Sequence, residues 1–340
     1  MAATSSDRLA DRTFSRRAIF RGSMWGARAS GDAWIRLSRR AMACSFEVTL
    51  GSEDAYHVPA AGAALDGVDA IEDQLTIFRE TSAIVDLNRR AALEPVAVNR
   101  ALFDLLRECV EIHRATDGAF DISSTPLSRC WGFLRRDARL PSQASIEAAR
   151  MKVGLDALVL DADSSTVRFS REGIELNLGA IGKGYALDRV AAEMRTAHIT
   201  HALLSAGRSS LLALGGHDKG WPVDLVSPRA QRPLARVWLR NAALGTSGAA
   251  EQSVTVDGVR YGHVIDPRTG WPASGILSST VIASTSARAD ALSTAFFIGG
   301  IPLARRYCAT HSDVMAIITP EANLATVVIG HYPGACVEAA

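Results

Sequence analysis

The sequence predicts an α+β fold, and two observations carry this prediction. The predicted helices and strands do not alternate strictly, as they would in a doubly wound sheet, and the C-terminal half is mostly strands with turns. Apolar residues make up 48% and charged residues 21% of the 340 residues. That composition is typical of a globular protein with a sizeable core. The length corresponds to one large domain or two domains of ordinary size.

The N-terminal half is expected to hold one strand and three helices. A first strand is expected over 34–50, where apolar and polar residues alternate. Apolar residues recur at helical spacing over 60–77 and 99–116, and Asn99 is a candidate N-cap. A short helix is expected over 145–151, after a segment at 124–141 that is typical of loop and turn.

The rest of the chain is expected to be mostly strands. Helices are predicted over 184–197, 287–298 and 301–311, with Gly299 and Gly300 separating the last two. The predicted strands are 157–161, 165–170, 173–178, 201–206, 210–215, 222–226, 234–239, 254–257, 279–284, 313–318 and 324–330.

Charge and cysteine content exclude several classes of protein. The net charge is +1, so a broad nucleic-acid surface is not expected and no nucleic-acid partner is predicted. No apolar run approaches the roughly 18 residues that a membrane helix needs. The five cysteines form no CxxC pair, which argues against a cysteine zinc site.

The N-terminal segment leaves the compartment open. Residues 15–21 (SRRAIFR) resemble a twin-arginine export signal, which would make the protein periplasmic. Polar and charged residues interrupt the apolar stretch of roughly 7–15 residues that such a signal also needs. A basic, disordered tail over 1–32 and a cytoplasmic protein are therefore the favoured expectation.

Residues 178–188 (LGAIGKGYALD) are the first candidate site. They follow a predicted strand and open a predicted helix, where backbone amides can meet an anion and Lys183 adds a positive charge. The spacing fits neither a Walker A loop nor G-x-G-x-x-G. Phosphate binding and a plain glycine-rich turn are both compatible with this segment.

Three further segments carry chemistry. Asp290 and Thr294 are four residues apart on one helical face and offer the hard oxygens that Mg²⁺ prefers, although Asp290 could also be a simple helix-start residue. His263 lies in a turn (YGHVIDPRTG) and could exchange a proton or be merely structural. Residues 118–133 bear aromatic side chains that could line a planar ligand or form a corner.

In this order the segments resemble the FAD:protein FMN transferases, the ApbE family. Met42 and the segment Phe78–Asn88 also fit the family pattern. The matching motifs are Gly118–Phe133, Asn177–Asp188, Thr246–Gly248, His263–Pro272 and Ala289–Ala295. The resemblance covers about residues 34–335, so one catalytic unit is expected over 33–335.

The resemblance implies a two-lobed catalytic fold with FAD in the cleft between the lobes. It implies Mg²⁺-dependent cleavage of FAD, transfer of FMN through a phosphoester to a Ser or Thr of a target flavoprotein, and release of AMP. The target would be a membrane redox complex or an FMN-binding domain. The implied metal ligands are Asp290, Thr294 and the carbonyl of Ala180, and the candidate catalytic residues are Lys183 and His263. The implied FAD contacts are Met42, Phe78, Ala119, Phe120, Asp121, Asn177, Lys183, His263 and Ile265.

Several positions depart from the family pattern. Asn177 stands where Asp is usual, Arg208 lies in the segment that usually reads G-G-D/N, and Ala249 follows Thr-Ser-Gly where Asp is common. Ser293 occupies a position where some members carry Asp. An FAD pyrophosphatase that releases FMN and AMP, or a flavin-binding protein without turnover, are the alternatives to a transferase.

Overall fold

The computed structural model describes residues 18–20 and 33–339, apart from 136, 138, 217, 227–232, 249–252, 257 and 323. The expected tail therefore lies outside the described residues except for Ala18–Phe20, which form strand β1. The export-like segment and the departure at Ala249 lie largely or wholly outside them as well. No helix among the described residues is long and apolar enough to span a membrane.

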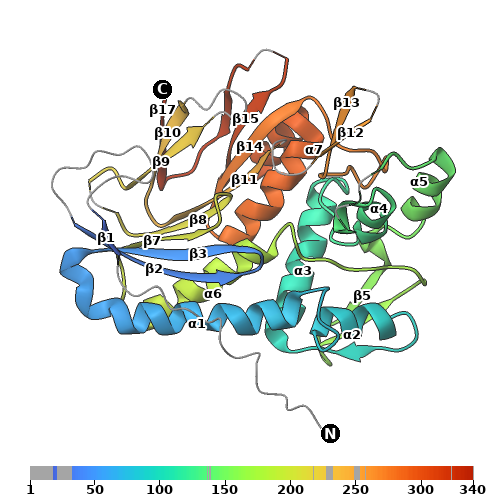
Figure 1. Cartoon of the computed structure of the whole chain (residues 1–340), viewed down its shortest axis with the longest axis horizontal. Helices are drawn as coiled ribbons and strands as arrows, with labels where there is room; N and C mark the ends of the chain where they lie inside the picture. Colours follow the sequence, from blue (N-terminus) through green and yellow to red (C-terminus); the bar gives the residue numbers. More distant parts are fainter. Residues whose placement is uncertain are drawn as a thin grey trace, which may run out of the picture.

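A nine-stranded sheet is the centre of the molecule (Figure 1). Its neighbouring strands all pair antiparallel, which agrees with the predicted α+β class. In spatial order the strands are β1 (Ala18–Phe20), β2 (Trp34–Ala41), β3 (Cys44–Gly51), β7 (Ala202–Ala206), β8 (Ser210–Leu214), β11 (Ala242–Gly248), β14 (Ile276–Ala283), β15 (Met315–Pro320) and β16 (Val327–Gly330).

Both faces of this sheet are covered. A three-stranded sheet packs on one face through a separate apolar cluster that includes Leu211, Val223 and Val237; its strands are β9 (Trp221–Val226), β10 (Pro233–Leu239) and β17 (Ala335–Ala339). Three helices join the main core with the strands: α1 (Val58–Leu75), α6 (Gly182–Thr196) and α7 (Ser286–Thr310). Every residue of β7, β8 and β14 is accordingly buried.

The remaining helices form a second part, which we call the helical part, at the right of Figure 1. Asn99 caps its longest helix by accepting the N–H of Leu102 at 2.9 Å, as the sequence predicted. The helical part comprises α2 (Ala83–Arg90), α3 (Arg100–Ala115), α4 (Thr125–Cys130), α5 (Gln143–Arg150), the 3₁₀ turns Phe133–Arg135 and Leu155–Ala157, and a small sheet of β4 (Val96–Ala97), β5 (Leu158–Asp161) and β6 (Thr166–Phe169). A 3₁₀ turn, Ser52–His57, precedes α1, and the hairpin of β12 (Ser253–Val256) and β13 (Val259–Gly262) lies beside α4 in Figure 1.

Several predicted elements are corrected by the structure. The single strand expected over 34–50 is a hairpin, because Met42 and Ala43 take positive φ and turn the chain. The loop expected over 124–141 contains α4, since a proline is tolerated in the first helical turn. The strand expected over 173–178 is reduced to one bridge between Glu175 and Ser124. Strands β1, β4, β11, β13 and β17 and helix α2 were not predicted.

The helix α7 approaches its neighbours at two glycines. A Cβ at Gly184 of α6 would lie 2.1 Å from the carbonyl oxygen of Ser286, and one at Gly245 of β11 would lie 2.5 Å from the carbonyl of Ala289. Asp188 of α6 accepts the first N–H groups of α7, from Ser286 and Ala287, at 2.8 Å each. The start of α7 is therefore held against both α6 and the sheet.

We predict that Gly184→Ala destabilises the protein, although alanine is the better helix former. The added methyl group must push α7 away from α6, and such overpacking costs about 1–3 kcal/mol. The matched control is Gly62→Ala in α1, where a Cβ meets nothing within 4 Å. That substitution should stabilise by about 0.5–1 kcal/mol. Urea unfolding of both variants measures this, and equal shifts would contradict the close approach.

A second prediction concerns pH. Burial raises the pKa of the Asp188 carboxyl from 3.8 to about 7, despite the two N–H groups that it accepts. Because the folded pKa is the higher one, the folded chain holds the extra proton, and stability falls as pH rises from about 4 to 7. Asp188→Asn should flatten the pH dependence of the urea midpoint between pH 5 and 8. An unchanged slope would show that Asp188 is ionised throughout.

Candidate functional site

A cleft of about 470 Å³ lies where the helical part meets the large sheet. Such a volume is within the usual range of small-molecule sites. It is lined by most of the residues that the sequence singled out: Phe78, Ala119, Phe120, Asp121, Asn177, Ala180, Lys183, His263, Ile265, Asp290 and Thr294. Met42 lies in an adjoining cavity of about 230 Å³ that shares Phe78, Asn177 and Lys183 with the cleft. All candidate site residues therefore lie at one place.

The glycine-rich loop is shaped by hydrogen bonds from its own sequence. The Asn177 side chain accepts the N–H of Gly179 at 2.9 Å, a bond that Asp would also make at this position. Helix α6 begins at Gly182, so its first amides lie next to Lys183. The N–H of Gly184 donates to Asp290 Oδ2 at 3.0 Å and joins this loop to α7.

Asp290 is the buried carboxylate of the site. It is 4% exposed, and its other oxygen accepts the hydroxyl of Ser210 at 2.8 Å. One turn further along α7, the Thr294 hydroxyl lies 3.2 Å from that of Ser247 on β11. The carboxylate and the hydroxyl thus project from the same face of α7, as their spacing predicted.

Ala180, Asp290 and Thr294 can together hold a magnesium ion. The described residues contain no group of three or more His, Cys, Asp or Glu side chains that could bind a metal. One carboxylate, the Thr294 hydroxyl and the Ala180 carbonyl instead offer hard oxygens around one cleft. Magnesium commonly takes one or two carboxylates and completes its shell with water and substrate phosphates. The donor set therefore fits Mg²⁺ and does not resemble a zinc site.

The wall formed by the helical part is braced by a buried polar network. Asp121 accepts the N–H of Ser123 at 2.7 Å and the N–H of Leu155 at 3.1 Å. The imidazole of His113 lies 2.9 Å from the Phe120 carbonyl. The Asp121 carboxylate thus binds the protein backbone, and this fixes the segment that places Ala119 and Phe120 in the cleft.

The turn that carries His263 is held from both ends. Asp266 accepts the backbone N–H of Arg268 at 2.9 Å, and its backbone N–H donates to the carbonyl of Trp271. Trp131, after α4, donates its indole N–H to the Gly270 carbonyl at 2.9 Å. The turn is therefore rigid, and it presents His263 and Ile265 to the cleft.

The structure adds three hydroxyls that the sequence analysis did not single out: Ser210, Ser247 and Thr125. Ser247 and Thr125 lay in the quoted motifs Thr246–Gly248 and Gly118–Phe133, but isolated hydroxyls have no periodic signal. Thr125 lines the cleft at 1% exposure, and its Oγ1 has no hydrogen-bond partner among the described residues. A buried hydroxyl without a partner is costly, so this atom is suited to bind a ligand in the cleft.

Comparisons with known proteins identify the family of the chain. Residues 42–318 match the model of the ApbE family. The FAD:protein FMN transferase of Escherichia coli K12 is 30% identical over 264 residues, which are 75% of each chain, and that of Salmonella typhimurium is 33% identical over 241 residues, 68% of this chain and 69% of the relative. The crystal structure of the Thermotoga maritima ApbE protein superposes with a TM-score of 0.77 at 28% identity, covering 90% of this chain and 97% of that one. The chain therefore belongs to the ApbE family.

Proposed function

We propose that the protein transfers FMN from FAD to a Ser or Thr hydroxyl of a target flavoprotein through a phosphoester bond and releases AMP. The observation that carries this proposal is the meeting of Lys183, Asp290 and Thr294 in one cleft, in a chain whose relatives are named FAD:protein FMN transferases. The proposed reaction explains why the site has groups that neutralise charge but no assigned nucleophile, because the attacking hydroxyl belongs to the partner protein.

We assign each part of FAD to a region of the cleft. We place the pyrophosphate at the start of α6, where backbone amides and Lys183 balance its negative charge. Ala180, Asp290 and Thr294 would hold Mg²⁺, which neutralises phosphate charge when bound. The apolar wall of Phe120 and Ile265, with Phe78 at the rim, would contact the ring systems. The helical part and the large sheet would then be the two lobes around FAD.

The transfer needs positioning and electrostatic stabilisation more than covalent participation by this chain. The acceptor oxygen forms a bond to the flavin-side phosphorus, the bond from that phosphorus to the oxygen of AMP breaks, and AMP leaves with the electron pair. The proton of the acceptor hydroxyl passes to a base, for which His263 is the candidate. The target would be a membrane redox complex or an FMN-binding domain, with the cytoplasm as the favoured compartment.

One assay tests this proposal. The purified protein is incubated with FAD, with and without Mg²⁺ and a purified FMN-binding domain, and AMP and protein-bound FMN are quantified. Mg²⁺-dependent AMP with FMN on the domain supports transfer. Free FMN and AMP in equal amounts would indicate a pyrophosphatase, and FAD retained without AMP would indicate a binding protein.

We predict that Asp290→Asn lowers Mg²⁺-dependent AMP release by about a hundredfold or more, because the only carboxylate of the donor set loses its charge. The matched control is Asp163→Asn, at an exposed aspartate outside the cleft, which should leave the rate unchanged. Circular dichroism verifies folding. Full AMP release by Asp290→Asn would exclude the metal assignment.

We predict that Thr125→Val weakens FAD binding about fivefold without loss of stability. The hydroxyl has no partner within the described protein, so its replacement by a methyl group of similar size removes no internal hydrogen bond. Flavin fluorescence titration measures the Kd, and urea unfolding measures stability. Unchanged affinity would show that this hydroxyl does not contact FAD.

A further inference from the structure

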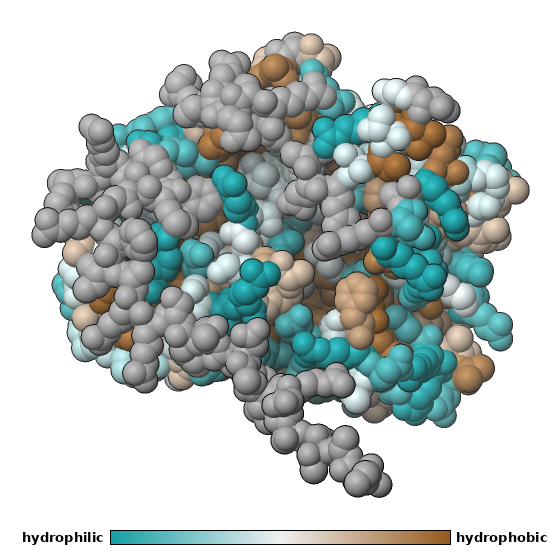
Figure 2. Space-filling model, in the orientation of Figure 1, coloured by the Kyte–Doolittle hydropathy of each residue, from teal (hydrophilic) through white to brown (hydrophobic). Residues whose placement is uncertain are grey.

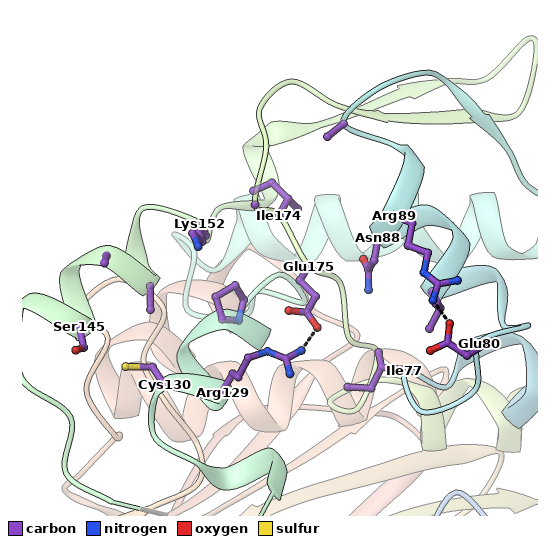
Figure 3. A pocket seen from close by; sticks show the side chains of 16 residues that line it. Ile77, Glu80, Asn88, Arg89, Arg129, Cys130, Ser145, Lys152, Ile174 and Glu175 are labelled. Atoms are coloured by element: carbon purple, nitrogen blue, oxygen red, sulfur yellow. Dashed lines mark hydrogen bonds and ion pairs between the residues drawn. The ribbon is translucent and has the colours of Figure 1, made fainter.

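A second and larger cavity opens on the helical part (Figure 3). This cavity, which we call the side groove, has a volume of about 840 Å³. Its walls come from α2, α4, α5 and the segment 173–175. Figure 3 shows Lys152 and Ser145 at one end and Arg89 and Glu80 at the other, with Arg129 and Glu175 between them. Two matching motifs, Phe78–Asn88 and Gly118–Phe133, contribute to this groove, but the resemblance assigns the groove no role.

The side groove lies directly beside the flavin cleft. Ile77 lines both the groove and the cavity that holds Met42, and the next residue, Phe78, lines the cleft. Helix α4 separates the two, with Pro126 and Arg129 lining the groove and Thr125 and Ser128 lining the cleft. The chain that forms the groove at 173–175 continues into the cleft at 177–180. Three segments of the chain thus line both cavities: 77–78, helix α4 and 173–180.

The lining of the groove combines apolar and charged groups. Ile174 and Ala149 provide buried apolar surface, and Ile77 and Val85 are partly exposed. Two of its three cations are paired, Arg129 with Glu175 and Arg89 with Glu80 (Figure 3). Lys152 has no acidic partner within 4.0 Å among the residues that the structure describes. The groove therefore offers one unpaired positive charge to whatever it binds.

A transferase with a protein acceptor has to hold more of that protein than one hydroxyl. The acceptor hydroxyl must reach the phosphate end of the cleft, and the residues next to it can pass into the groove at Ile77 and Phe78, where the two cavities adjoin. Phe78 is 77% exposed, and its side chain is available to a second protein. An open groove beside the cleft, with apolar walls and an unpaired cation, suits a polypeptide segment better than a small polar metabolite.

We propose that the side groove binds an extended segment of the acceptor protein that flanks its Ser or Thr, with an acidic side chain of that segment at Lys152. This inference rests on the proposed transfer activity and identifies where the acceptor is recognised. Pairing with Lys152 contributes mainly to the encounter and to partner choice, as charges at interface rims commonly do.

Steady-state kinetics test the groove, with a purified FMN-binding domain as the acceptor probe. The groove variants are Lys152→Glu, which reverses the unpaired charge, and Ala148→Arg, which fills the groove from α5. Their controls are Arg305→Glu, at an exposed arginine of α7, and Ala144→Arg, at an exposed alanine of α5 outside the groove lining.

The groove variants should raise the KM for the acceptor domain about fivefold or more, while kcat and the KM for FAD stay unchanged. The effect of Lys152→Glu should shrink in added salt, whereas that of Ala148→Arg should not. Equal acceptor KM values in the groove variants and their controls would overturn the proposal. A parent enzyme that never labels the domain would instead count against the transfer activity itself.

A footprint tests binding without turnover. Cys130 is partly buried in the groove, and Cys336 is exposed on the distant strand β17. Without Mg²⁺ and FAD, a saturating amount of the acceptor domain should slow alkylation of Cys130 by a maleimide at least about threefold. Alkylation of Cys336 in the same sample should not change. An unprotected Cys130 beside a bound domain would place the acceptor elsewhere on the protein.

Discussion

The close approach of helix α7 to α6 and to strand β11 is the constraint on which the site depends. Two glycines permit it, because a Cβ at Gly184 or at Gly245 would overlap the backbone of α7. At this distance the Gly184 N–H reaches the Asp290 carboxylate, and the glycine-rich loop and α7 form one wall of the cleft.

The polar groups around Asp290 explain how the chain tolerates its departures from the family pattern. Asn177 makes the hydrogen bond that shapes the loop, and the Ser210 hydroxyl donates a hydrogen bond to the Asp290 carboxylate. Ser293 is buried and hydrogen-bonded to Ser247 and to the Asp290 carbonyl. Asn177 and Ser293 are thus both hydrogen-bonded, and each lowers the negative charge near the site relative to an Asp at the same position. In the proposed mechanism, a lower charge would leave more of the coordination of Mg²⁺ to the phosphates of the substrate.

Elements of the helical part line both the flavin cleft and the side groove. Two sets of hydrogen bonds make the inner wall of the cleft rigid: the bond from the Trp131 indole to the Gly270 carbonyl, and those that the Asp121 carboxylate accepts. The opposite side of α4 lines the side groove. The face seen in Figure 2 carries small hydrophilic and hydrophobic patches interspersed among its coloured residues. This mixed surface is in keeping with a net charge of +1 and with recognition of a protein by a local groove.

The sequence alone determined the local features of this protein. Helical periodicity located α1, α3, α6 and α7, and Asn99 marked the start of α3 because capping depends on a few adjacent residues. The motifs named the glycine-rich loop, the His263 turn and the Asp290–Thr294 pair that the structure brings together at the cleft, and the roles of these residues remain predictions. Only the tertiary structure revealed the hairpin at Met42, strand β11, the unpartnered hydroxyl of Thr125 and the side groove. Each of these arises from contacts between segments far apart in the chain, and a pattern of neighbouring residues does not encode such contacts.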